Sequence, residues 1–411
     1  MVPSEVALVK AMIRRLSGFA LLPLLTALSP LLVLPVIARI GGPELWASVT
    51  TAQAIGALAG TVASFGWYVS GPPKIVAAAD ASEKARIYAL SLGMRLPLVI
   101  SLFGVALVTI QPLLRAAHVE SALMLASTTF VGLTMSWFAI GEGRPGLIAA
   151  YELIPRLIAT GISLPAVILT GWVGWYPISV IVLGLAGLVV FHRSQFGRSW
   201  PAFPGIDELR IGFRENRAPA LIDILGAAYS SSPMPVATAT QTLSSAATMA
   251  SAEKVYRYSL FSVVALANAL QGWVLSSAQS QRPRRERLAF GAHVTLGVCG
   301  GLGIALLGPW ISAFLFGDKV AASFFTTLWL GVAFLAVSSS TPLIRNVLVP
   351  AKKAHGVVVA TATGAIVGVP CMLVLAHAHG VAGLAAGLAT SEMVILAMLI
   401  IATRRLRGRI L

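Results

Sequence analysis

Charged residues are scarce in this chain, and acidic residues are scarcest of all. Asp and Glu together number 15 in 411 residues, against 30 Lys and Arg, and only 11% of all residues are charged. Soluble globular domains have about a quarter of their residues charged. The shortage excludes an ordinary soluble enzyme or binding domain.

Long polar stretches and phosphate-binding loops are also missing. The longest polar connection covers only residues 192–217, which is too short to bury a core of its own. The chain has no Gly-Lys-Ser or Gly-Lys-Thr loop of the kind that cradles nucleotide phosphates. We therefore expect no nucleotide hydrolysis, no appended catalytic domain and no enzymatic activity.

Cysteine is equally rare. Cys299 and Cys371 both fall in apolar segments, where small packing roles are more common than disulfides or metal ligation. The sequence thus predicts neither a metal site nor a cofactor.

Apolar residues are what the chain has in abundance. Hydrophobic residues make up 57% of it and the mean hydropathy is +0.85. Apolar runs of about 18 residues, long enough to cross roughly 30 Å of hydrocarbon as a helix, recur throughout. They predict twelve transmembrane helices, at residues 16–38, 46–67, 88–110, 121–140, 147–170, 174–191, 218–240, 249–277, 288–308, 323–344, 356–376 and 381–403.

The net charge of +15 follows this span pattern. If the N-terminus lies in the cytoplasm, nearly all basic residues between spans fall on the inner side, and only Arg39, Arg115 and Lys319 fall outside. This bias is the positive-inside rule, and it predicts that both termini are cytoplasmic. Because the basic excess is explained by topology, no nucleic-acid partner is expected.

Two halves of six spans each can be matched. A segment "GLIAAYELIPRLIATGISLPAVILTGWVG" from Gly146 and a segment "GVVVATATGAIVGVPCMLVLAHAHGVAG" from Gly356 share a Gly start, an internal proline and a Gly-rich end. We expect pseudo-symmetric halves at 1–205 and 206–411, related as in parallel-repeat transporters, around a central cavity.

Prolines recur in the first and seventh spans, which would be equivalent in such a repeat. Either these prolines mark bending helices beside a transport cavity, or they produce ordinary packing kinks. They are Pro23, Pro30 and Pro35 in the first span and Pro219, Pro233 and Pro235 in the seventh.

Several motifs resemble those of one family of membrane transporters, the polysaccharide transporter or O-antigen flippase family. They are "LPVIARIGGPELWASVTTAQAIGALAGTVASFGW" over the first two spans, the Trp-Phe-x-x-Gly turn in "SWFAIGEGRPGLIAAYELIPRLI", "MASAEKVYRYSLFSVV", "GPWISAFLFGDKVAAS" and "HGVAGLAAGLATSEMVILAML". They occur in the family's order and cover nearly the whole chain.

The resemblance implies a transporter of the multidrug, oligosaccharidyl-lipid and polysaccharide exporter superfamily. The resemblance further implies that the chain flips a polyprenyl-diphosphate-linked oligosaccharide across the bacterial plasma membrane, by alternating access, for export of polysaccharide or cell-envelope glycan. The implied partners are the lipid-linked oligosaccharide, membrane lipid, and a glycan polymerase and glycosyltransferases.

Five basic residues at membrane depth or at its outer mouth are candidates for binding the diphosphate and glycan. Arginine suits a diphosphate because its planar fork makes paired hydrogen bonds and keeps its charge. The alternatives are that Arg95 and Arg156 snorkel to headgroups, and that Lys254 and Arg257 mark only the end of a span. The candidates are Arg39, Arg95, Arg156, Lys254 and Arg257.

Four acidic residues are candidates for coupling transport to a proton or sodium ion: Glu152, Asp223, Glu253 and Glu392. Charged groups inside a membrane are costly and are functional hypotheses by default. Glu152 precedes Arg156 by four residues, the favourable spacing for a helical ion pair, and Pro155 between them loosens the backbone. Glu392 has no base within a turn, so a structural hydrogen bond is the alternative for it.

Three other functions compete with flipping. A drug antiporter of the same superfamily would want an acidic, aromatic-lined cavity. A membrane polymerase or ligase would need catalytic residues on a large outer loop, and the predicted outer connections are short. A non-transporting scaffold would bind partners without moving any cargo.

Overall fold

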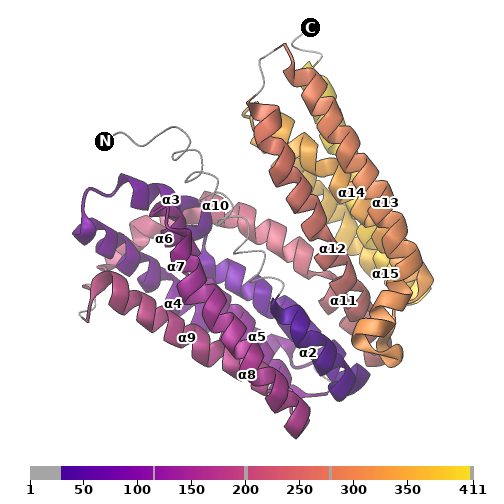
Figure 1. Cartoon of the computed structure of the whole chain (residues 1–411), viewed down its shortest axis with the longest axis horizontal. Helices are drawn as coiled ribbons and strands as arrows, with labels where there is room; N and C mark the ends of the chain where they lie inside the picture. The colour runs from indigo at the N-terminus through magenta and orange to yellow at the C-terminus, as the bar shows by residue number, and fades with distance from the viewer. Residues whose placement is uncertain (1–28, 114–115, 199–201, 277–279, 408–411) are drawn as a thin grey trace, which may run out of the picture. The chain divides into compact units, whose positions relative to one another are not determined.

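The computed structural model describes residues 29–113, 116–198, 202–276 and 280–407. Every secondary-structure element among these residues is helical, and the elements divide into two compact units (Figure 1). The first unit contains residues 29–41 and 51–228, and the second contains residues 42–50 and 229–407. The predicted fold class, an all-α membrane protein built from two helical halves, is confirmed.

The helices of the first unit begin with a short 3-10 turn, and two of them, α2 and α10, carry residues of both units. The elements of this unit are η1 (Ser29–Leu32), α2 (Leu34–Ser64), α3 (Trp67–Ala77), α4 (Ala81–Ile110), α5 (His118–Thr129), η2 (Phe130–Leu133), α6 (Ser136–Gly141), α7 (Pro145–Ile148), η3 (Ala149–Leu153), α8 (Ile154–Thr170), α9 (Trp175–Phe196) and α10 (Ile206–Ser231).

The second unit contains three of the longest helices of the chain. Its elements are α11 (Pro233–Thr240), α12 (Leu243–Leu275), α13 (Arg282–Phe316), η4 (Asp318–Val320), α14 (Phe324–Pro342), η5 (Leu343–Leu348) and α15 (Ala354–Arg407). Helix α15 breaks at His379 and Gly380, where Gly380 takes a φ of 61°. The parts of α15 before and after this break contact each other, and Ser391 Oγ donates to the carbonyl of Gly364 at 2.6 Å. The break matches the predicted pair of spans 356–376 and 381–403.

Eight of the described helical stretches are long and apolar enough to cross a membrane. They are Ala81–Ile110, His118–Gly141, Pro145–Thr170, Trp175–Phe196, Leu243–Leu275, Arg282–Phe316, Phe324–Leu348 and Ala354–Leu406. Each predicted span from 46–67 onward falls, in its described residues, on one helix or on consecutive helical elements. Most of the first predicted span, 16–38, lies outside the described residues.

Helix α10 packs with the first unit, although the sequence boundary at 205 assigned it to the second half. Gly66, at a φ of +75°, lets the end of α2 approach the backbone of Ala220 closely. Lys74 on α3 forms an ion pair with Glu215 on α10 at 2.7 Å. The contacts therefore divide the chain after Ala228, and the division at 205 stays a prediction about the repeat.

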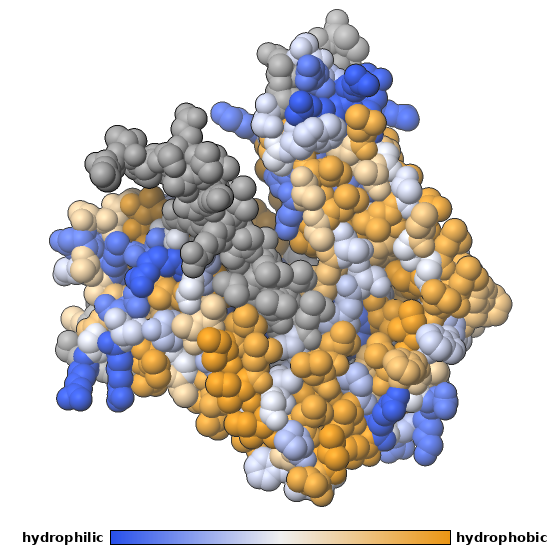
Figure 2. All heavy atoms as spheres, viewed as in Figure 1, coloured by the Kyte–Doolittle hydropathy of each residue, from blue (hydrophilic) through white to orange (hydrophobic). Residues whose placement is uncertain are grey.

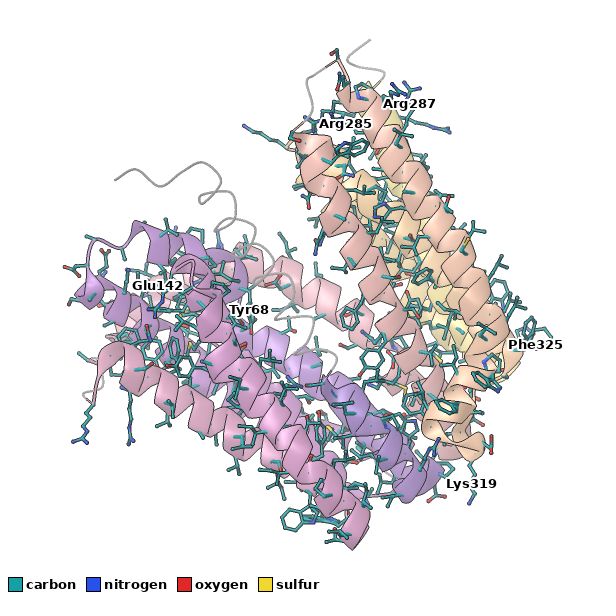
Figure 3. All side chains as sticks on the ribbon, in the orientation of Figure 1. Tyr68, Glu142, Arg285, Arg287, Lys319 and Phe325 are labelled. Atoms are coloured by element: carbon teal, nitrogen blue, oxygen red, sulfur yellow. The ribbon has the colours of Figure 1, made fainter. Side chains whose placement is uncertain are left out.

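Large apolar side chains cover the outside of the helices. Leu169 is 83% exposed, and Val108 and Ile366 are each 73% exposed. Figure 2 shows hydrophobic residues along the lengths of the helices and hydrophilic residues gathered near their ends. In the second unit, Arg285 and Arg287 lie at one end of α13, whereas Lys319 and Phe325 lie beyond the other (Figure 3). This distribution suits an apolar environment around the middle of each bundle.

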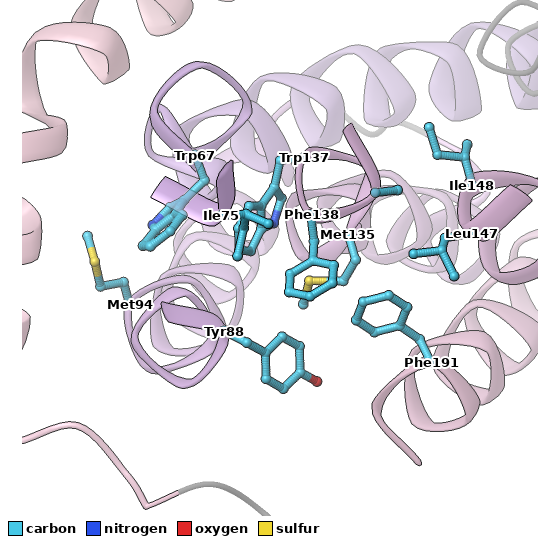
Figure 4. Close-up of a cluster of buried hydrophobic side chains, with 11 residues drawn as sticks. Trp67, Ile75, Tyr88, Met94, Met135, Trp137, Phe138, Leu147, Ile148 and Phe191 are labelled. Carbon is cyan, nitrogen blue, oxygen red and sulfur yellow. The ribbon is translucent and has the colours of Figure 1, made fainter. Parts of the chain in front are cut away.

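Aromatic side chains form the core around the Trp-Phe-x-x-Gly motif of the first unit, residues 137–141 (Figure 4). Trp67 and Trp137 are both fully buried, with ring centroids 5.0 Å apart. Gly71 on α3 makes room for Trp137, whose ring atoms would lie 2.3 Å from any Cβ added there. The Trp-Phe pair of the motif thus anchors α6 against α3 and α9.

Candidate functional site

The candidate site of the first unit is built around a break in its fourth span. Between η2 and α6 the chain leaves the helical conformation, with Thr134 extended at φ −60° and ψ 152° and Met135 at φ −111° and ψ 16°. A broken helix leaves carbonyls without donors on one side and amides without acceptors on the other. Within a membrane these groups need protein partners.

Arg95 on α4 serves the carbonyls of the break. Its Nη1 donates to the carbonyls of Gly132 at 3.0 Å and Thr134 at 2.8 Å. Its Nη2 lies 3.2 Å from the sulfur of Met135, and its guanidinium lies 5.7 Å from the centre of a Trp137 ring. The residue is 0% exposed, which argues against the alternative that it snorkels to headgroups.

Glu152 serves the amides on the other side of the break. Its Oε1 accepts from the Met135 amide at 2.8 Å, and the amide and hydroxyl of Ser136 also interact with this carboxylate. Such carboxylate caps are charge-assisted hydrogen bonds, which are roughly twice as strong as neutral ones. Two ionisable residues predicted as function-bearing therefore hold the same backbone break from opposite sides.

Glu152 itself lies in a wide turn of the fifth span. Residues Ala149–Leu153 form a π-helical turn, in which the Ile154 amide bonds to the carbonyl of Ala149. Pro155 follows at the start of α8 and has no amide to donate. Gly187 on α9 allows close approach here, since a Cβ on it would lie 2.6 Å from the carbonyl oxygen of Tyr151. Single π turns are frequent at functional sites.

A cavity of about 300 Å³ opens beside the break. Residues with hydroxyl groups line it from several helices. The hydroxyl of Tyr68, a residue labelled in Figure 3, hydrogen-bonds with that of Thr134. Its lining residues are Tyr68, Ser127, Phe130, Val131, Leu133, Thr134, Met135, Ser136, Ile148, Tyr151, Glu152, Pro155, Arg156, Val180, Gly184, Gly187, Leu188 and Phe191. The cavity therefore combines an apolar surface with hydroxyls, one carboxylate and one guanidinium.

Arg156 is the basic residue among these lining residues. Its Nε is buried without a hydrogen-bond partner, and its side chain interacts with Tyr176 on α9. The predicted ion pair with Glu152 is absent from the ion pairs of the described residues. That prediction was wrong because the carboxylate turns to the amides of the break.

In the second unit the predicted charges on α12 are engaged with nearby groups. Arg257 forms an ion pair with Glu253 at 2.7 Å and also donates to the carbonyl of Ser230. Lys254 lies between them in sequence and is half-buried, with an electrostatic or polar interaction of its own. None of these contacts tests the predicted binding and coupling roles, which stay predictions.

The remaining predicted residues are not among the lining residues of this cavity. Glu392 on α15 accepts from the Tyr229 hydroxyl at 2.9 Å, which is the structural hydrogen bond named as its alternative. Asp223 is half-buried on α10, and Arg39 is exposed on α2. Of the nine predicted residues, the structure brings Glu152 and Arg156 into one cavity and places Arg95 behind its wall.

The hydroxyl-bearing residues of the cavity were missed in the sequence. Thr134 and Ser136 interrupt an apolar run as "LTMSW", and polar residues within a span could have drawn attention to that position. Tyr68 offered no such signal, because it lies beyond the end of its span. Among the described residues, no three His, Cys, Asp or Glu side chains gather as a metal site.

Comparison with known proteins identifies the fold. No family model matches the chain, and no curated protein sequence does. An inward-facing multidrug resistance MATE family transporter of the MOP superfamily is similar over 92% of this chain and 94% of its own, with a TM-score of 0.67 and 14% identity. The chain shares the fold of such transporters.

Two further solved structures agree. The lipid II flippase MurJ, in an inward closed conformation, has a TM-score of 0.69 and 12% identity, and the match covers 93% of this chain and 87% of that protein. The MATE multidrug transporter DinF-BH, solved as a complex, has a TM-score of 0.59 and 15% identity over 96% of this chain and 94% of its own. At such identities the likeness establishes the fold alone. The proteins that share this fold include both a drug transporter and a lipid flippase.

Proposed function

We propose that the chain is a transporter that flips a polyprenyl-diphosphate-linked oligosaccharide across a bacterial plasma membrane. Its two halves would alternate access to a central cavity, with both termini in the cytoplasm. The fold supports transport in general, since its neighbours include MATE transporters and a lipid II flippase. The choice of cargo is supported by the charges of the cavity.

The single observation that carries this proposal is which charge in the cavity is available. The Glu152 carboxylate is taken by the Met135 amide at 2.8 Å and by Ser136. The Arg156 guanidinium keeps a buried Nε without a partner. Tyr176 bonds to the same guanidinium. A guanidinium with one unpaired donor attracts an anionic group such as a diphosphate, and the surrounding hydroxyls can bond to sugar.

The second candidate is an antiporter for cationic drugs. The fold favours it as much as it favours flipping, since DinF-BH is a multidrug transporter of similar structure. A cationic drug would need a carboxylate to pair with, and it would meet Arg156 at the same cavity wall. Glu152 would have to pair with the drug while its carboxylate also accepts from the Met135 amide and interacts with Ser136.

Ion coupling is part of the proposal. Asp223 is half-buried, and no hydrogen bond or ion pair of its carboxylate is among those of the described residues. Glu253 is paired with Arg257, and Glu392 is bonded to Tyr229. Asp223 is therefore the acid whose protonation would disturb the fewest contacts, and we expect it to carry the coupling proton or sodium ion.

The test is a flipping assay with the full chain in proteoliposomes. A fluorescent polyprenyl-diphosphate oligosaccharide is supplied on one side, and its arrival in the other leaflet is measured with a membrane-impermeant quencher. We expect flipping by the parent and at least about tenfold less by Arg156→Gln, since each charge-assisted bond is worth about 1.5–3 kcal/mol.

The matched control is Arg193→Gln, which changes an exposed arginine at the end of α9 and should flip at the parental rate. Efflux of the cationic dye ethidium is measured on the same liposomes. Absence of flipping together with dye efflux would replace the proposal with the antiporter. Full flipping by Arg156→Gln would remove Arg156 from the mechanism.

A further inference from the structure

The break in the fourth span is held by residues that belong to three different helices. Arg95 comes from α4, the carbonyls and amides of the break come from the segment between η2 and α6, and Glu152 comes from the π turn before α8. All of these residues lie within the first unit. The break is therefore a junction that ties three spans together.

The geometry of Arg95 is directed at the backbone and not at the cavity. Arg95 is absent from the cavity lining, and one nitrogen of its guanidinium, Nη1, donates to the carbonyls of both Gly132 and Thr134 on one side of the break. The Thr134 carbonyl belongs to the peptide bond whose amide, on Met135, donates to Glu152 at 2.8 Å. The Thr134–Met135 peptide therefore has its oxygen bonded to the Arg95 cation and its N–H bonded to the Glu152 anion.

Hydrogen bonds at both the carbonyl oxygen and the amide N–H fix the orientation of this peptide. The peptide dipole lies with its negative oxygen toward Arg95 and its positive N–H toward Glu152, so each charge strengthens the bond made by the other. The same peptide connects Thr134 to Met135, and both residues line the cavity together with Ser136. Rotation of this peptide would move the cavity wall that carries these groups.

We infer that Arg95 is a positioning residue, which acts through the Thr134–Met135 peptide to hold Glu152 and the cavity hydroxyls in place. Its part in transport rests on the proposed function, whereas its action on the cavity wall does not. The inference replaces the direct diphosphate contact predicted for Arg95, because the donors needed for that contact point to backbone carbonyls.

The experiment measures the cavity wall directly, with a cysteine reporter in the full chain. Gly184 on α9 lines the cavity, and a Cβ there meets no atom within 4 Å. Gly184→Cys is introduced after both natural cysteines are changed, as Cys299→Ala and Cys371→Ala. The rate of alkylation by N-ethylmaleimide then reports entry to the cavity without any cargo.

Arg95→Lys keeps the charge but loses Nη2 and Nε, which lie against the Met135 sulfur and the Ser91 carbonyl and fix the direction of Nη1. We expect it to raise the alkylation rate about fivefold. Such a rise corresponds to a loss of about 1 kcal/mol in the free energy that favours the closed cavity wall over an opened one. Glu152→Leu should have an effect of similar size. The double variant should not exceed the larger single effect, since residues that act through one network are not additive.

Two controls isolate the junction. Arg345→Lys changes an arginine of the second unit that donates to Asn268 at 2.7 Å, and it should leave labelling of Gly184→Cys unchanged. Gly303→Cys on α13, where a Cβ also meets no atom within 4 Å, should label at one rate in every background. If Arg95→Lys does not fold, Met135→Leu removes only the sulfur acceptor and should raise the rate about twofold.

An unchanged labelling rate for Arg95→Lys or, where that variant does not fold, for Met135→Leu would overturn the inference. A double variant equal to the product of the single effects would also overturn it. In the flipping assay Arg95→Lys should lower the maximal rate, whereas Arg156→Gln should raise the cargo concentration at half-maximal rate. The expected labelling without any flipping would overturn the proposed function and leave the role of Arg95 in place.

Discussion

The fourth span of the first unit and helix α14 of the second unit hold equivalent positions in the predicted repeat, and they are built differently. The fourth span is broken at Thr134 and Met135, and Arg95 and Glu152 satisfy its freed backbone groups. Helix α14 runs unbroken into the π turn η5, where the Val349 amide bonds to the carbonyl of Ile344 at 3.0 Å.

In α14 a neutral hydroxyl, and not a charged side chain, bonds to the backbone of a neighbouring helix. Ser338 is fully buried, and its Oγ donates to the carbonyl of His293 on α13 at 2.6 Å. A π turn widens a helix without freeing as many backbone groups as a break does. The difference teaches that Arg95 and Glu152 serve the interruption of the fourth span, and the cavity lies beside that interruption.

The largest effect should come from removing the cation that caps the break. Arg95→Ala leaves the carbonyls of Gly132 and Thr134 buried without donors, so we expect a loss of about 3 kcal/mol or more in stability. The measurement is thermal unfolding of the purified chain in detergent, followed by size-exclusion chromatography. Arg193→Ala, at an exposed site, should stay within about 0.5 kcal/mol of the parent. An equally stable Arg95→Ala variant would show that the break needs no cation.

The next effect separates the capping role of Glu152 from a coupling role. Glu152→Gln keeps an oxygen that can accept from the Met135 amide, whereas Glu152→Leu keeps none. We expect flipping within about threefold of the parent for Gln and about thirtyfold lower for Leu, because an uncapped amide destabilises the wall by about 1–3 kcal/mol. Equal inactivity of both variants would instead make Glu152 a proton-coupling acid.

A smaller effect is expected for the charge pair of the second unit. The Glu253 side chain is 4% exposed but that of Arg257 is 41% exposed, so solvent weakens their attraction. Glu253→Gln should lower stability by about 1 kcal/mol, as measured by thermal unfolding. A loss as large as that of Arg95→Ala would show that the second unit depends on its charges as much as the first.

The smallest effect should come from the hydroxyl of α14. Ser338→Ala removes one hydrogen bond to a carbonyl and leaves its helix continuous, so we expect a loss of about 0.5–1.5 kcal/mol in thermal unfolding. Flipping should be unchanged, since Ser338 is not among the cavity residues. A transport defect in this variant would mean that the second unit carries a functional turn of its own.

The sequence predicted the helical spans well and the pairing of charges poorly. Long apolar runs leave the backbone few alternatives to a helix in a membrane, so the spans after the first coincide with described helices. The spacing of Glu152 and Arg156 was right for a helical pair. The pair does not form because Glu152 lies in a π turn, and because freed amides of another span bind the same carboxylate.

Composition and periodicity alone thus determined that this chain is an all-helical membrane protein with a few charged residues inside its apolar segments. Those features depend on local hydrophobicity, which each segment carries by itself. Only the tertiary structure decided what each charge does. Arg95 is turned to Gly132 and Thr134, which lie far from it in sequence, and Arg156 keeps a buried donor at the cavity. Hydrogen-bond partners of this kind depend on which spans pack together, and no single span encodes that packing.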